Sequence, residues 1–202
     1  NNEVMPVALH RPFAGEDSAP VQRKLWTREE CGFLVKSGVL DTRRYELLEG
    51  ELIERMSKNY PHMRAVMLLC RWLNRIFAEG RVLQEPSIHL TAQDTPYSDP
   101  EPDAVVLNRP FDLFAGKALP ADIVLLVEVS DTSLGLDATR KAALYARAGI
   151  QDFWILDING RRIIVHRDPV GDAFRSITAF NEDEPVTSLA APEHSVRAAD
   201  LF

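Results

Sequence analysis

The segment DIVLLVEVSD, residues 122–131, constrains the fold more than any other part of the sequence. It holds five consecutive aliphatic residues, Ile123 to Val127, followed by one acid, Glu128, and another valine. Such a run predicts a β-strand that is buried on both faces of a sheet. Because burial of an unpaired carboxylate is unfavourable by several kcal/mol, Glu128 must be protonated, paired with a cation, placed at a wet strand end, or bound to a metal ion.

Composition limits the class of protein. With 202 residues, of which 46% are hydrophobic, the chain can form one domain with a substantial core. We expect an extended leader over residues 1–25 and a single domain over 26–202. No apolar stretch approaches the roughly 18 residues that span a bilayer, and the N-terminal segment has no secretory h-region, so we expect a soluble, cytoplasmic protein without membrane contact. Cys31 and Cys70 lie in helical patterns and are expected to be core thiols.

The remaining patterns indicate one central mixed sheet flanked by helices, an α/β or α+β fold. A capping box, Thr27 to Glu30, predicts a helix that closes near Gly38, and a hairpin is expected around Glu49-Gly50. Asn59 is expected to cap a longer helix that runs to about Glu79. Further strands are expected at 81–85, 87–91, 104–107, 152–157, 162–166 and 174–180, with a helix over 134–149 and an irregular tail at the C-terminus.

The predicted helix after Asn59 has two distinct faces. Apolar residues, Val66, Leu69, Leu73, Ile76 and Phe77, recur at helical spacing on one side, and Arg64, Arg71 and Arg75 lie on the other. Such an arginine stripe is more often a solvated face than a track for phosphates. The net charge of −7 argues against a protein that coats nucleic acid by bulk electrostatics, so any DNA contact must be local.

A second acid, Asp103, stands at the start of the predicted strand 104–107, after Pro100 and Pro102. A Pro-Asp pair is usually turn chemistry, and Glu128 could simply be a partly wet acid bridged to Lys141. Two carboxylates about 5 Å apart at an effective dielectric near 20 repel by roughly 3 kcal/mol, however, and a divalent cation would turn that repulsion into binding. Ligation by oxygen alone favours Mg²⁺ or Mn²⁺ over zinc.

Several motifs together resemble the Uma family of restriction endonucleases, a branch of the PD-(D/E)XK nuclease superfamily. They are YELLEGELIERMS, PHMRAVMLLCRWL, EPDAVVL, LVEVS and DATRKAALYARAGIQDFWILD, in that order, and the resemblance covers roughly residues 27–170. It implies a restriction-endonuclease-like core of mixed strands flanked by helices, with a Mg²⁺-dependent site for phosphodiester cleavage at one edge.

The resemblance also implies roles for particular residues. Asp103 and Glu128 match the acids that hold the metal ion, Lys141 matches a lysine on the following helix, and Glu46 matches the acid of the Tyr-Glu-Leu stretch. The wider superfamily carries a lysine two residues after the second acid, where this chain has Ser130, so Lys141 must act in its place. The alternative is a structural role, in which Lys141 only forms an ion pair with Asp137 one helical turn earlier.

Two of these residues also have ordinary interpretations. Glu46 could hold a second metal ion or a water molecule, although an acid on a solvent-facing strand is the commoner explanation. His62, in the first turn of the helix after Asn59, could touch a phosphate or transfer a proton, although a histidine at a helix start is usually a surface residue.

Three classes of function stay open on the sequence. The first is a metal-dependent endonuclease that acts on DNA, and such an enzyme could be a homodimer. The second is a catalytically quiet module with a nuclease fold that binds nucleic acid or protein, in keeping with the acidic balance and the missing Glu-x-Lys. The third is a metal hydrolase with a substrate other than nucleic acid.

Overall fold

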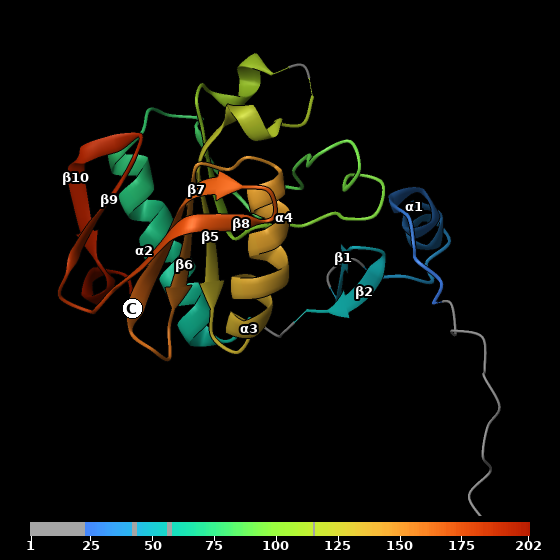
Figure 1. Ribbon diagram of the computed structural model, residues 1–202, viewed down its shortest axis with the longest axis horizontal. Coiled ribbons are helices and arrows are strands. Elements are labelled where there is room, and N and C mark those ends of the chain that lie inside the picture. The colour runs from blue at the N-terminus through green and yellow to red at the C-terminus, as the bar shows by residue number, and fades with distance from the viewer. Residues whose placement is uncertain (1–22, 42–43, 56–57, 115) are drawn as a thin grey trace, which may run out of the picture.

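A six-stranded sheet forms the centre of the computed structural model, which describes residues 23–41, 44–55, 58–114 and 116–202 (Figure 1). The strand order is β3-β4-β5-β6-β7-β8, and only β5 and β6 are parallel neighbours. The expected mixed sheet is therefore confirmed. Its strands are β3 (Val82–Gln84), β4 (Ala104–Leu107), β5 (Ile123–Ser130), β6 (Asp152–Asp157), β7 (Arg162–Val170) and β8 (Ala173–Phe180).

The parallel pair β5 and β6 needs a connection that crosses one face of the sheet. This crossover contains α3 (Leu134–Leu136), a π-helical segment (Asp137–Lys141) and α4 (Ala142–Arg147), and it ends at Gly149, whose φ is +79°. We expected one continuous α-helix over 134–149, and the π-helical segment corrects that expectation. π-helical segments are rare in proteins, and those that occur often lie at functional sites.

The opposite face of the sheet is covered by α2 (Tyr60–Ile76). Asn59 caps it as expected, because its side chain accepts a hydrogen bond from the backbone N–H of His62 at 3.1 Å. The helix ends three residues before the expected end at Glu79, since Phe77 is already extended. Val66, Leu69 and Leu73 are buried against the sheet as predicted, together with Phe77, whereas Ile76 is only partly buried.

Strand β5 divides the core into two layers by alternation. Leu125, Val127 and Val129 pack in the cluster that includes α2, whereas Leu126 packs in the cluster that includes α4. Ile123 also packs with α4, because a register shift in the β4–β5 pairing interrupts the alternation between Ile123 and Leu125. Glu128 follows Leu126 at a spacing of two, and its side chain therefore faces the crossover helix. The predicted strand that is buried on both faces is confirmed.

The N-terminal elements lie beside the crossover side of the sheet (Figure 1). They are α1 (Arg28–Lys36), opened by the expected capping box, and the antiparallel hairpin of β1 (Tyr45–Leu48) and β2 (Glu51–Glu54). Of the leader predicted for 1–25, residues 1–22 lie outside the described part of the chain. None of the helices in the described ranges is long and apolar enough to cross a membrane.

Two further expectations about secondary structure were wrong. Residues 87–91 form no strand, although Ile88 and Leu90 are buried, because alternation reports side-chain burial and their backbone has no strand partner. The C-terminal segment is not an irregular tail. It forms a hairpin of β9 (Pro185–Ser188) and β10 (Ala191–Arg197), whose buried Val186 and Val196 join the core on the α2 side.

Asp152 attaches this C-terminal hairpin to the sheet. Its fully buried carboxylate accepts hydrogen bonds from the Trp154 indole at 2.9 Å, from Arg167 Nε at 2.8 Å and from the Leu189 backbone N–H at 2.8 Å. A buried carboxylate with three donors fixes β6, β7 and the hairpin relative to one another.

We therefore expect Asp152→Asn to lower the free energy of unfolding by roughly 1.5–3 kcal/mol, because the amide replaces one of the two acceptor oxygens with an NH2 group that faces another donor, and the charge that pairs with Arg167 is lost. Urea unfolding measures this change. Asp183→Asn, at an exposed position near the same hairpin, is the matched control and should change stability by less than about 0.5 kcal/mol. Equal effects of the two substitutions would contradict the attachment role.

Candidate active site

Asp103 and Glu128 face each other across the β4–β5 pair. Ala104 pairs with Val127 in the antiparallel register, and one further step along that register sets Asp103 opposite Glu128. Directly opposed residues have Cβ atoms about 4.5–5.5 Å apart and point to the same face of the sheet. The backbone N–H of Val129 also donates to Asp103 Oδ2 at 2.7 Å. The two acids that the sequence singled out therefore converge.

Glu128 is buried, with 3% of its surface exposed. Lys141 Nζ and the Tyr145 hydroxyl both donate to its Oε1, at 3.1 and 2.6 Å. Burial raises the pKa of this carboxyl well above its ordinary value although the charge of Lys141 opposes the shift, and the three other acids of the site add to it. Those acids are Asp137, Asp103 and Glu46. Because both donors contact Oε1, Oε2 is the oxygen that can carry a proton or bind a cation.

Lys141 is the buried cation of the site. Its Nζ lies 3.1 Å from Glu46 Oε2, 3.1 Å from Glu128 Oε1 and 3.8 Å from Asp137 Oδ1. Burial disfavours the charged form, but the surrounding carboxylates outweigh burial and the pKa of Lys141 is raised. The pairing with Asp137 and the bridge to Glu128 that the sequence suggested are therefore both present. Glu46 is buried rather than solvent-facing, which corrects the ordinary interpretation of that acid.

Ser130 and Asp137 link the strand to the turn that carries Lys141. The hydroxyls of Ser130 and Ser133 each donate to Asp137 Oδ2 at 2.6 Å, which leaves Oδ1 toward Lys141. Asp137 and Lys141 are the first and last residues of the π-helical segment. Ser130 therefore contacts Asp137, the acid whose other oxygen faces Lys141.

His62 reaches Asp103 from the first turn of α2. Its Nε2 lies 3.2 Å from Asp103 Oδ1, so the expectation of an ordinary surface histidine is wrong. Burial opposes protonation of this ring, but the hydrogen bond and the charge of Asp103 outweigh burial and raise the pKa of His62 above its ordinary value. A charged His62 therefore partly neutralises Asp103.

A cavity of about 100 Å³ joins these groups. Its lining includes Glu46, His62, Asp103, Glu128, Asp137 and Lys141. Arg64, Arg71 and Arg75 are not among its lining residues and lie exposed along α2, as the predicted stripe required.

Sequence reasoning missed two residues of the site. Tyr145 read as one more apolar member of the helix pattern, although its position four residues after Lys141 sets both on one helix face. Arg55 lines the cavity, and its buried Nε has no hydrogen-bond partner among the described residues. Nothing in the sequence around Arg55 distinguished it from a surface arginine.

The donor set fits a hard divalent cation. Within the described ranges, no three acidic, histidine or cysteine side chains are already arranged as metal ligands, and no hydrogen bond reaches Glu128 Oε2. Two carboxylates are nevertheless sufficient, because Mg²⁺ keeps several waters and is commonly held by one or two carboxylates together with substrate phosphate. Acidic side chains also outnumber basic ones around the cavity, by seven to four. The acids are Glu46, Glu54, Glu101, Asp103, Glu128, Asp131 and Asp137, and the basic residues are Arg55, Lys58, His62 and Lys141.

Comparison with solved structures places this fold among nuclease-like proteins. The crystal structure of a "putative nuclease belonging to DUF820" from Anabaena variabilis ATCC 29413 matches with a TM-score of 0.65 and 16% sequence identity, over 83% of this chain and 94% of that chain. The model of the Uma2 family, described as "Putative restriction endonuclease", matches residues 39–199. The chain therefore belongs to the Uma2 family, and the resemblance drawn from its motifs is confirmed. A search of curated proteins found no match.

The charge balance of the site predicts unequal effects of two substitutions on stability. Lys141→Met leaves three buried carboxylates without their cation, so we expect the free energy of unfolding to fall by roughly 3 kcal/mol or more. Glu128→Gln leaves Lys141 paired with Glu46 and Asp137, so its effect near pH 7 should be small or stabilising. Denaturant unfolding at neutral pH, without divalent ions, measures both changes.

The pH dependence of the Glu128 variant follows from the raised pKa. Because the native state holds this proton more tightly than the unfolded chain, the contribution of Glu128 to stability falls as the pH rises above about 4.5, the ordinary value. Glu128→Gln should remove part of that fall.

The matched control for Lys141→Met is Lys36→Met, which removes an exposed lysine of α1 and should be nearly neutral. A Lys141→Met protein as stable as that control would refute this account of the site.

Proposed function

We propose that this protein is a Mg²⁺- or Mn²⁺-dependent endonuclease that hydrolyses DNA phosphodiester bonds. The observation that carries the proposal is the convergence of Asp103, Glu128 and Lys141 on one cavity at the end of the β4–β5 pair. Membership of the Uma2 family supports the same class of reaction.

In this proposal Asp103 and Glu128 hold the metal ion. A bound Mg²⁺ would offset charge on the phosphate oxygens and lower the pKa of the attacking water. Asp103 would bind through Oδ1, in exchange for its contact with His62, and Glu128 through Oε2. The hydrogen bonds on Glu128 Oε1 would fix the carboxylate in that orientation, as groups behind metal ligands commonly do.

Lys141 would act on the reacting phosphate. An ammonium that is held among carboxylates stays protonated, so it can orient water or stabilise charge on the transition state but cannot serve as a general base. Glu46 would hold Lys141, or a water molecule beside the metal ion. His62, once released from Asp103, would be free to touch a phosphate oxygen.

Arg64, Arg71 and Arg75 are proposed to contact DNA phosphates outside the cavity. Their support is that they are exposed on α2, the helix whose first turn also carries His62. They would add affinity rather than chemistry, because phosphate contacts by arginine position a nucleic acid without reading its sequence.

We expect Asp103→Asn and Glu128→Gln to abolish Mg²⁺-dependent DNA cleavage in proteins that stay folded. Each substitution preserves shape and removes a ligand charge. Lys141→Arg keeps the buried cation and should lower turnover while sparing metal affinity, since the proposed role of the ammonium begins as charge develops in the transition state. Nicking of supercoiled plasmid measures cleavage, and thermal melts with and without millimolar Mn²⁺ measure folding and binding.

The exposed acid Asp183 supplies the matched control, and Asp183→Asn should cleave like the wild type. A wild-type protein that gains no thermal stability from Mg²⁺ or Mn²⁺, and nicks no DNA, would refute the proposal and favour the catalytically quiet module.

A second test addresses metal binding alone. The raised pKa of Glu128 means that a proton leaves when the cation binds, so Mn²⁺ affinity should rise with pH above the ordinary carboxyl range. Tyr145→Phe removes the 2.6 Å hydrogen bond that orients Glu128 and should weaken Mn²⁺ binding by roughly tenfold at fixed pH. Calorimetry in two buffers of different ionisation enthalpy gives the affinity and the number of protons released.

Tyr45→Phe is the matched control, because the Tyr45 hydroxyl has no hydrogen bond within the described part of the chain. Its Mn²⁺ affinity should equal that of the wild type. Binding that is independent of pH, or is unchanged by Tyr145→Phe, would show that Glu128 is not a ligand.

A further inference from the structure

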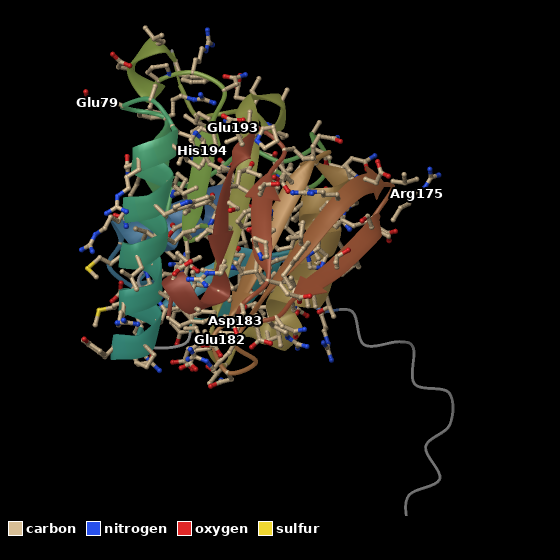
Figure 2. All side chains as sticks on the ribbon, turned by 90° about the vertical axis from the view of Figure 1, so that its left-hand side faces the viewer. Glu79, Arg175, Glu182, Asp183, Glu193 and His194 are labelled. Carbon is tan, nitrogen blue, oxygen red and sulfur yellow. The ribbon has the colours of Figure 1, made fainter. Side chains whose placement is uncertain are left out.

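Helix α2 is positively charged in an acidic protein. Its sequence, YPHMRAVMLLCRWLNRI, holds three arginines and no acid, while the whole chain carries a net charge of −7. The next acid is Glu79, beyond its C-terminal end (Figure 2). Within the described ranges no carboxylate lies at salt-bridge distance from Arg64, Arg71 or Arg75. The positive charge of this face is therefore available to bind a polyanion.

Large apolar side chains share this exposed face of α2. Tyr60 is 74% exposed, Met63 53% and Met67 48%, and their spacing of three and four residues sets them in one row beside the arginines. Figure 2 shows sulfur- and nitrogen-bearing side chains that project from α2 away from the sheet. Thioethers and an aromatic ring interleaved with arginines suit the flat faces of nucleobases.

A groove runs beside this row, between α2 and the end of β3. Its walls include Met63, Met67, Cys70, Arg71 and Gln84. Lys58 and His62 line both the groove and the catalytic cavity, so the two are adjacent. A strand whose phosphate occupies the cavity would therefore pass a neighbouring nucleotide along the groove.

The two volumes suit different parts of a nucleotide. The groove measures about 370 Å³, within the range of roughly 300–1,000 Å³ that small-molecule pockets occupy. The catalytic cavity, at about 100 Å³, lies well below that range. The groove therefore offers a neighbouring base more room than the cavity does, and a base that enters the groove cannot stay paired in a duplex.

We infer that the groove along α2 binds unpaired bases, and that the substrate of the proposed nuclease is single-stranded or locally unpaired DNA. Arg64, Arg71 and Arg75 track the phosphates, while Met63 and Met67 contact the bases. The inference rests on the proposed function and narrows its substrate class.

Charge argues against a second copy of this chain as the occupant. A symmetric dimer through α2 would apply the same patch from both partners, so the arginines of one helix would meet those of the other with no acid on either helix. Single-stranded DNA supplies both the negative charge and the flat apolar faces that complement this surface.

The test begins with binding in the presence of EDTA. Fluorescence anisotropy compares a labelled single-stranded DNA with its blunt duplex on the full chain, and we expect the single strand to bind at least roughly tenfold tighter. Cleavage in Mn²⁺ of a duplex with an internal unpaired tract should fall within that tract.

Two sets of variants separate base contacts from phosphate contacts. Met63→Ser with Met67→Ser should weaken single-strand binding by roughly tenfold, the scale of one lost base-stacking contact, and leave its salt dependence unchanged. Replacing Arg64, Arg71 and Arg75 by Gln should instead lower the slope of log affinity against log salt by roughly 2. Ile177→Ser, at a comparably exposed position on β8, is the control and should change neither.

The outcomes distinguish this inference from the proposed function. Equal affinity for single strand and duplex, or no loss in the Met63→Ser/Met67→Ser protein, would overturn the inference even if the wild type cleaves DNA. Single-strand preference without any metal-dependent cleavage would support the groove and refute the hydrolysis. A dimer in sedimentation that these two substitutions dissociate, with DNA binding unchanged, would overturn the inference and assign the groove to a second copy.

Discussion

The buried ammonium of Lys141 allows several acids to share one small volume. Without it, Glu46, Glu128 and Asp137 would repel one another in a region that water screens poorly. Each acid comes from a different element: the β1–β2 hairpin, β5 and the crossover. The ammonium therefore joins the N-terminal hairpin to the central sheet as well as balancing charge, and the cavity depends on that attachment.

The strand order explains how the lysine can stand so far along the chain from the strand acids. A parallel neighbour for β5 requires a crossover, and the crossover packs on the face that Glu128 shares with Leu126. Lys141, on that crossover, therefore reaches Glu128 from the same side of the sheet. The Ser130 hydroxyl donates a hydrogen bond to Asp137.

Residues 103–130 show how much the sequence could predict. The aliphatic run predicted β5, its single acid pointed to Glu128, and the Pro-Asp bend pointed to Asp103, because each breaks a local rule that only tertiary contacts can satisfy. Tyr145 broke no such rule: a tyrosine on an apolar helix face reads as core, and its hydrogen bond to Glu128 appears only when β5 is placed. The β9–β10 hairpin was missed because PEHS interrupts its alternation, and its attachment to Asp152 is a long-range contact.

The position of Lys141 along the chain has a consequence for synthesis. Residues emerge from the N-terminus, so Glu46, Asp103, Glu128 and Asp137 all precede the cation that compensates them, and β6 follows it. A nascent chain that stops short of Lys141 contains the acids of the cavity without the group that holds them together. The cavity can therefore form only after Lys141 has been made, when β3, β4 and β5 of the central sheet already precede it in the chain.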